Sequence, residues 1–286
     1  SSIRLKYLLY FFRYYEAQLQ KSGTGTTFKA ITQNVIKNIE VPVPSLDEQE
    51  RIVSKIEELF SKLDASVAEL KIAKEKLKVY RQAVLKEAFG CAESFVPFGN
   101  ITDARLGKML DKEKNTGTPQ RYLRNINVRW FNFDLSDLLE MRIGLDEIEK
   151  YSIQYGDLVI CEGGEPGRCA VWEEQEPIFY QKALHRVRFT DGSNPKFYMY
   201  YLWFAAQTGQ LKRFFTGTGI KHLTGQSLVN VPVPSADKNT QDHAVSEIEF
   251  RLSVCDSIEQ TVDTSLQKAE ALRQSILKQA FEGRLN

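Results

Sequence analysis

Apolar residues between Leu46 and Phe89 recur at alternating spacings of four and three. They fall at Ile52, Ile56, Leu59, Leu63, Leu70, Leu77 and Val84, with Ser66, Ala73 and Tyr80 at the remaining steps. This spacing is typical of the heptad seam of a coiled coil, and it predicts a long helix over residues 45–90. At a rise of about 1.5 Å per residue, such a helix is ~60 Å long.

A second stripe with the same register predicts another long helix over residues 235–286. Its members are Ala244, Ile248, Cys255, Ile258, Val262, Ala269, Leu272 and Ile276. Two matched stripes in one chain are each other's simplest partners, so we expect the helices to pack together. Prolines at 42, 44, 232 and 234 mark the border before each helix, and Asp47 and Asp237 are typical helix-start residues.

The two helices belong to a longer internal repeat. Residues 81–89 (RQAVLKEAF) return as 273–281 (RQSILKQAF), and residues 24–32 (TGTTFKAIT) return as 216–224 (TGTGIKHLT), both 192 positions later. The VPVP of 41–44 returns at 231–234, offset by 190, and the aromatic run 7–12 is aligned with 199–204. Residues 1–90 are thus one copy and 193–282 another, whereas residues 91–192 have no partner in the chain.

The segment 91–234 is predicted to be a globular domain of short strands and helices. Strands are expected at 121–128, 158–161, 169–172 and 183–189, followed by a helix over 196–214 and a Thr-Gly-Thr-Gly loop. Gly and Pro turns separate these elements. The predicted fold class is therefore α+β, with two long helices beside a mixed domain.

Composition narrows the function classes. The chain of 286 residues is 42% hydrophobic and 26% charged, with apolar runs far too short to cross a bilayer, so we expect a cytoplasmic protein with no membrane contact. Its four cysteines form no CxxC or Cys/His cluster, so no metal site is indicated. The net charge of +1 argues against a nonspecific nucleic-acid coat but permits local basic patches.

Several motifs in a fixed order resemble the specificity subunits of type I restriction-modification systems. These are residues 217–224 (GTGIKHLT), the VPVP, and a heptad helix ending in 273–285 (RQSILKQAFEGRL), together with 122–128 (YLRNINV) and 156–164 (GDLVICEGG). The resemblance covers nearly the whole chain. It identifies 1–44 as the remnant of a first target-recognition domain, 45–90 as the central conserved helix, 91–234 as a second recognition domain and 235–286 as the C-terminal conserved helix.

The resemblance also implies partners. In this family two recognition domains, held apart by two antiparallel helices, each read one half of a split DNA site. The helices dock modification subunits, which carry S-adenosylmethionine and methylate adenine, and a motor-nuclease subunit joins them. The front of the first recognition domain has no counterpart in this sequence, which puts in doubt whether this chain alone reads both halves. No cofactor is expected in the chain itself.

Candidate DNA contacts are basic and amide side chains in the predicted domain, because Arg and Lys hold phosphates and Arg and Asn can read base edges. The candidates are Arg105, Lys108, Lys112, Arg124, Asn125, Arg129, Arg168, Gln181, Lys182 and Lys221. Arg124 and Asn125 are the first choices for base contacts, with a solvated charged strand as the alternative. Lys108 and Lys112 are expected in a flexible loop, where a mobile surface loop without ligand is the alternative. The glycine loop carrying Lys221 is either a phosphate contact or a joint between domain and helix.

Catalysis is not indicated. No NPPY-type or DPPY-type tetrapeptide of an adenine methyltransferase occurs, and residues 162–167 and 23–29 fit neither GxxxxGK[ST] nor GxGxxG. We therefore predict a noncatalytic, sequence-specific DNA-binding subunit. The alternative is a structural coiled-coil adaptor whose globular domain binds another protein.

Overall fold

The computed structural model describes residues 2–22, 31–111, 113 and 115–285. The chain divides into two compact units, Ser1–Val79 with Cys255–Asn286, and Tyr80–Val254. We call these the first and the second unit. Each unit contains a stretch of both long helices, so the predicted borders at 44, 90 and 234 are not the borders of the compact units. The assignment of domains to those ranges stays a prediction.

The chain mixes helices and strands, which confirms the α+β class. The α-helices are α1 (Leu5–Ser22), α2 (Gln33–Lys37), α3 (Leu46–Phe89), α4 (Ile148–Tyr151), α5 (Pro195–Gln207), α6 (Gly225–Val229) and α7 (Lys238–Phe281). Short 3-10 helices are η1 (Phe98–Asn100), η2 (Asn125–Asn127), η3 (Leu145–Glu147) and η4 (Gln210–Phe214). The strands are β1 (Phe95–Pro97), β2 (Thr102–Leu106), β3 (Thr118–Leu123), β4 (Leu139–Ile143), β5 (Ser152–Ile153), β6 (Leu158–Cys161), β7 (Cys169–Val171), β8 (Ile178–Tyr180), β9 (Leu184–Phe189) and β10 (Pro232–Pro234).

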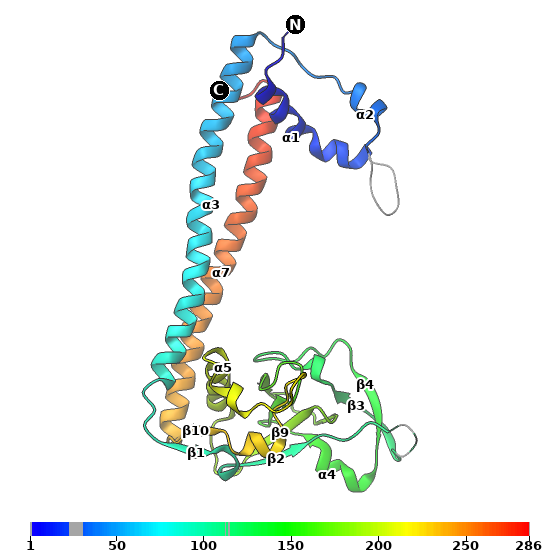
Figure 1. Ribbon diagram of the computed structural model, residues 1–286, viewed down its shortest axis with the longest axis vertical. Helices are drawn as coiled ribbons and strands as arrows, with labels where there is room; N and C mark the ends of the chain where they lie inside the picture. Colours follow the sequence, from blue (N-terminus) through cyan, green and yellow to red (C-terminus); the bar gives the residue numbers. More distant parts are fainter. Residues whose placement is uncertain (1, 23–30, 112, 114, 286) are drawn as a thin grey trace. The chain divides into compact units, whose positions relative to one another are not determined.

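The second unit is built on two four-stranded sheets. Their strand orders are β2-β9-β6-β7 and β4-β3-β8-β5, and β1 with β10 forms a separate two-stranded ribbon. One core joins the first sheet to α5 and to the ends of the long helices through Leu158, Val187, Leu202, Phe89 and Ile248. A second core lies between the sheets around Leu123, Val159, Tyr180 and Leu184. Figure 1 shows β2 and β9 side by side within this unit.

Three predicted elements differ from the observed ones for local reasons. The strand expected at 121–128 ends at Leu123, because the Asn127 side chain accepts a hydrogen bond from the Arg124 amide (2.8 Å) and folds the chain into η2. The helix expected at 196–214 breaks after Gln207, where Gly209 adopts a left-handed φ of 76°. The strand expected from 183 begins at Leu184, because Ala183 has a φ of 136°.

The long helices α3 and α7 lie side by side and run antiparallel (Figure 1). In the first unit Asp64 forms an ion pair with Arg273, and ten residues further along α3, Lys74 pairs with Asp263 at 2.7 Å, ten residues earlier on α7. In the second unit Arg251 pairs with Glu87 at 2.7 Å. Partner residues have rising numbers along α3 and falling numbers along α7, so the two helices are antiparallel.

The predicted apolar stripe is confirmed at alternate seam positions and confirmed in part at the positions between them, where Ile52, Leu59 and Ala244 are half-buried and pack against the buried cores. Ile56, Val84, Ile248, Cys255, Val262, Ala269 and Ile276 are buried, as expected. Ile258 and Leu272, by contrast, are 44% and 51% exposed. The next residues, Glu259 and Arg273, instead form ion pairs with α3. Charged side chains occupy these seam positions and pack through their aliphatic stems. A prediction based on hydrophobicity alone therefore chose the apolar residues next to them, which face outward.

The two copies of the repeat use the same caps. Thr32 accepts a hydrogen bond from the Val35 amide at the start of α2, and Thr224 accepts one from the Ser227 amide at the start of α6. Asn38 and Asn230 end these helices in matching conformations. The second half of the repeated motif therefore encodes the N-cap of a short helix in each copy. Residues 23–30, which contain most of the first copy of the loop, lie outside the described residues.

The alignment of 7–12 with 199–204 is wrong by two residues. Buried glutamines fix the register: Gln49 Oε1 accepts from the Arg4 amide (2.8 Å), and Gln241 Oε1 accepts from the Asn194 amide (2.7 Å). The aromatic contacts give the same register. Phe281 packs on Tyr7, Phe11 and Tyr14, and in the other copy Phe89 packs on the corresponding Phe197, Tyr201 and Phe204. Helix α1 thus matches α5 at an offset of 190. Two aromatic-rich segments can be aligned at several offsets from sequence alone, and the contacts in the structure determine which offset is correct.

Within the described part of the chain, no helix is both long enough and apolar enough to cross a membrane.

Candidate nucleic-acid interface

Most of the predicted site residues gather where several strands end. In the first sheet, Leu106 at the end of β2 and Cys161 at the end of β6 flank His185 and Leu184 at the start of β9. In the second sheet, β3 and β8 run parallel and end together, with Leu123 beside Tyr180. The turns that leave these strands carry Lys108, Arg124, Asn125, Gln181 and Lys182. We call this end of the second unit the loop end.

Backbone hydrogen bonds tie these turns to one another. The Gln181 amide donates to Leu123 O (3.1 Å), and the Lys182 amide donates to Lys108 O (2.7 Å). The Glu162 amide, just after β6, donates to Ala183 O (2.9 Å). Ala183 and Phe131 are the non-glycine residues with positive φ among those described, and both lie in or beside these turns. Strain of this kind needs support from the surrounding structure and is common at functional sites.

The loop that carries Lys221 joins the same end. The Leu223 amide donates to Glu162 O (2.7 Å), and Thr216 and His222 exchange two backbone hydrogen bonds that close the loop at its base. Lys221 is exposed, and its Nζ donates to Gly217 O (2.7 Å). With the 163–166 turn, this loop lines a cavity of about 540 Å³ that also includes Lys212 and Phe215.

Lys108 is not in a flexible loop. It is 5% exposed, its amide donates to Tyr180 O (3.0 Å), and its ammonium forms an ion pair with Glu147. That ion pair lowers the pKa of the Glu147 carboxyl, which also accepts a hydrogen bond from the Gly144 amide. A buried and paired ammonium is poorly placed for a mobile phosphate contact. Lys112 lies outside the described residues.

Arg124, Asn125 and Arg168 are engaged within the protein. Arg124 donates to the Asp137 carboxylate (2.6 Å) and to Asp137 O (2.7 Å). Asn125 Nδ2 donates to Gly163 O (2.7 Å), while its Oδ1 accepts from Arg168 (3.0 Å). Both ends of the amide that would read an adenine are therefore occupied. Whether any of the three contacts DNA stays a prediction, but their observed partners are protein groups.

Other predicted cations are exposed and more loosely held. Arg105, Lys182 and Lys221 are exposed and form no ion pair within the described part of the chain, and Arg129 reaches Asp134 only at 3.5 Å with half of its side chain exposed. Gln181 is half-buried beside Lys108. The loop end thus holds two kinds of basic residue: braced ones that pair with Glu147, Asp137 and Glu165, and exposed ones available to a polyanion.

Sequence reasoning missed Lys212 and the bracing role of Glu165. Lys212 lies on η4 beside the cavity that Lys221 lines, and its position directly before the Thr-Gly-Thr-Gly loop was the available signal. Glu165 accepts from Trp130 Nε1 (2.7 Å) and from Arg168 (3.0 Å) and so joins two loops. Nothing in the sequence marks this carboxylate, because its partners are three and 35 residues away.

The buried titratable groups nearby are poor nucleophiles or bases. Burial raises the pKa of the Cys161 thiol to about 11, so the thiol stays protonated at neutral pH. Burial lowers the pKa of His185, whose Nε2 lies 2.9 Å from Leu223 O. His185 is fully buried. Among the described residues no group of three or more His, Cys, Asp or Glu side chains could hold a metal ion.

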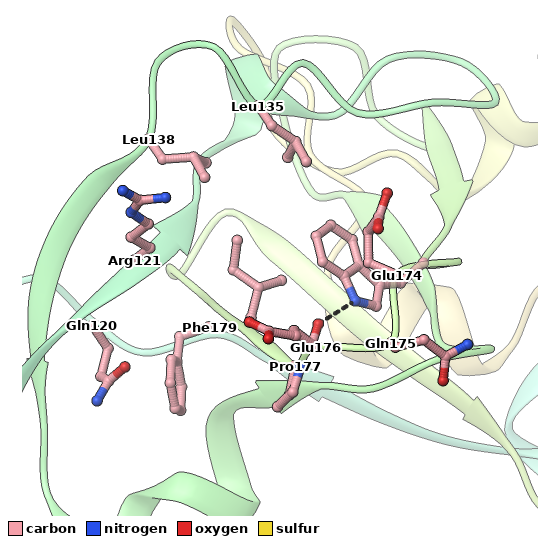
Figure 2. A pocket seen from close by; sticks show the side chains of 11 residues that line it. Gln120, Arg121, Leu135, Leu138, Glu174, Gln175, Glu176, Pro177 and Phe179 are labelled. Carbon is pink, nitrogen blue, oxygen red and sulfur yellow. Dashed lines mark hydrogen bonds between the residues drawn. The ribbon is translucent and has the colours of Figure 1, made fainter.

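A second cavity, of about 590 Å³, lies at the other end of β7. Figure 2 shows Arg121 and Leu138 on one side of it and Glu174, Glu176 and Pro177 on the other. Trp172 also lines this cavity, and its Nε1 donates to Glu176 O (3.0 Å). Two carboxylates at the rim would repel phosphate, so we do not assign DNA to this cavity.

An α+β unit with a cationic loop end, attached to antiparallel long helices, is the architecture that the sequence motifs led us to expect. Comparison with known proteins indicates a similarity to the same family. A family model described as the type I restriction modification DNA specificity domain matches residues 2–73. The EcoKI specificity subunit of Escherichia coli K12 is 24% identical over 293 residues, which cover 95% of this chain and 63% of that protein. The StySPI specificity subunit of Salmonella potsdam is 27% identical, with the same two coverages.

Solved structures agree on the fold. A chain from a study of complex assembly and conformational transition of the type I R-M system aligns with a TM-score of 0.80 at 19% identity, covering 98% of this chain and 71% of that one. The HsdS subunit from Thermoanaerobacter tengcongensis aligns with a TM-score of 0.63 at 20% identity, covering 98% and 70%. The chain is thus related to the specificity subunits of type I restriction-modification systems, which confirms the resemblance seen in the sequence. It spans less than two thirds of the length of the curated relatives named above.

Proposed function

We propose that this chain is a sequence-reading subunit of a type I restriction-modification enzyme and performs no catalysis itself. The second unit would read one half of a bipartite DNA site with its loop end. One observation carries the proposal: exposed Arg105, Arg129, Lys182 and Lys221 surround turns that a dense hydrogen-bond network holds in place. Exposed cations supply phosphate affinity, and a rigid arrangement of loops supplies the geometry that base readout needs.

The long helices are the proposed docking site for the modification subunits. On α7 of the second unit Phe250 is 65% exposed and Val254 is 43% exposed, and on α3 of the first unit Ile72 and Val79 are 55% and 67% exposed. Large exposed apolar residues on helices favour a protein partner over solvent. S-adenosylmethionine would belong to that partner, and a motor-nuclease subunit would complete the restriction enzyme.

Selection from a random-sequence DNA duplex tests the proposal. We expect the purified 286-residue chain to enrich one short motif, and to bind it at least ~1,000-fold more tightly than scrambled duplex at physiological salt. Affinity for both duplexes should fall steeply as salt rises, because bound phosphates release counterions. A structural adaptor, the alternative function, would enrich no motif and show no salt-dependent binding to duplex.

A further inference from the structure

Two loops at the loop end are joined to each other by side-chain hydrogen bonds, and a third is joined to them through the backbone, where the Leu223 amide donates to Glu162 O. The η2 loop contributes Asn125 and Trp130, the turn after β6 contributes Gly163 and Glu165, and Arg168 lies at the base of that turn. A single guanidinium carries most of the connection. Arg168 donates to the Glu165 carboxylate (3.0 Å), to Asn125 O (3.1 Å) and to Asn125 Oδ1 (3.0 Å).

The amide of Asn125 completes the link. Its Nδ2 donates to Gly163 O (2.7 Å), and its Oδ1 accepts from Arg168. The amide of Asn125 therefore holds the η2 loop to the turn through two hydrogen bonds. Trp130 Nε1 adds a third point through Glu165 Oε1 (2.7 Å). Gly163 also lies against the 216–222 loop: a Cβ at this position would come within 3.0 Å of His222 Nδ1. The third loop is therefore set by the same turn.

We infer that Asn125 and Arg168 are positioning residues that fix the spacing of the reading loops, so that sequence selectivity depends on them while phosphate affinity does not. This inference rests on the proposed function. Arg168 keeps only 15% of its side chain exposed, and Asn125 has both ends of its amide occupied, so neither is available to a base without breaking the network. The exposed residues that these two hold in place, Arg129 and Lys221 among them, make the contacts.

The test compares variants on two duplexes, the motif selected by the unaltered chain and its scrambled form, across a salt series. For Arg168→Ala we expect the preference for the selected motif to fall at least about tenfold, while binding to scrambled duplex changes less than about twofold. The slope of log affinity against log salt should stay as in the unaltered chain. Asn125→Asp, which loses the donor to Gly163 O, should behave alike, and Arg168→Lys should recover part of the preference.

Matched controls separate positioning from simple stability and from direct contact. Arg188→Ala removes another arginine with two hydrogen bonds, those to Asp157 (2.8 and 2.7 Å), from the opposite end of β9, and should lower Tm but leave the preference intact. Lys182→Ala removes an exposed cation and should reduce the salt slope by about one. Should Arg168→Ala not fold, Glu165→Gln carries the same test, because it removes only the anchoring carboxylate.

The outcomes are distinct. If Arg168→Ala weakens binding to both duplexes equally and reduces the salt slope by about one, Arg168 is a phosphate contact and the inference is overturned. An unchanged preference in Arg168→Ala and Asn125→Asp overturns it as well. If the unaltered chain itself shows no preferred motif, the proposed function fails instead.

Discussion

At the scale of single residues, buried polar groups hold the loops and helix ends in place. Gln49 and Gln241 are 0% and 1% exposed. Each accepts a hydrogen bond from the backbone amide directly before an earlier helix of its copy, Arg4 before α1 and Asn194 before α5. Unpaired buried amides are costly, so one glutamine per copy stabilises the junction of helix and domain. The same logic explains His185, which is buried against Leu223 O at the loop end.

His185 makes stability depend on pH in a defined direction. Because burial lowers its pKa, the folded chain resists a proton that the unfolded chain accepts below its ordinary pKa near 6.5. Stability from neutral His185 is present above that pH and is lost as pH falls. Between pH 7.5 and 5.5 the unaltered chain should lose unfolding free energy, and we expect His185→Gln, which retains a donor toward Leu223 O, to lose less.

Chemical denaturation at the two pH values measures this effect. His243→Gln is the matched control, since it makes the same substitution at an exposed histidine, on α7. Equal pH dependence in His185→Gln and the unaltered chain would contradict the assignment.

At the scale of elements, the helix pair depends on a seam that alternates apolar and charged residues. Ile56 is fully buried in the seam of the first unit, whereas Ile72, on the same helix, is 55% exposed. Ile56→Ala should lower the free energy of unfolding by about 2–4 kcal/mol, because it removes buried methylenes and leaves a cavity. Ile72→Ala, the matched control, should cost less than ~1 kcal/mol. Similar losses for the two variants in denaturant titrations would place the seam elsewhere.

The hydrophobic pattern predicted some elements accurately and others only in part. The buried strand 158–161 was predicted with its observed bounds, because a short apolar run between turn residues leaves little choice. Some seam positions could not be predicted, because Lys74, Glu259 and Arg273 enter the seam through ion pairs with the other helix. Likewise β3 ends early through the side chain of Asn127, a contact that hydrophobic periodicity does not encode.

At the scale of the whole molecule, the repeat was the most informative feature of the sequence. The apolar stripe predicted the first of the two 44-residue helices, and the same register in the second copy predicted the other. Their antiparallel pairing followed from the family resemblance. The loop end was only partly predictable. Most of the basic and amide residues chosen from the sequence lie at the loop end, and whether they contact DNA stays a prediction. Their division into braced and exposed members depends on strand pairings between segments some 60 to 80 residues apart, such as β2 with β9 and β3 with β8.

The central claim is that the second unit chooses a DNA sequence on behalf of a methylating partner. Co-expression of the chain with its matching modification subunit, followed by genome-wide mapping of methylated adenine, tests this most directly. We expect methylation at a single motif, and a different motif when residues 91–234 are exchanged for those of a relative while both long helices are kept. Methylation that is absent, or that keeps the same motif after the exchange, would contradict the account.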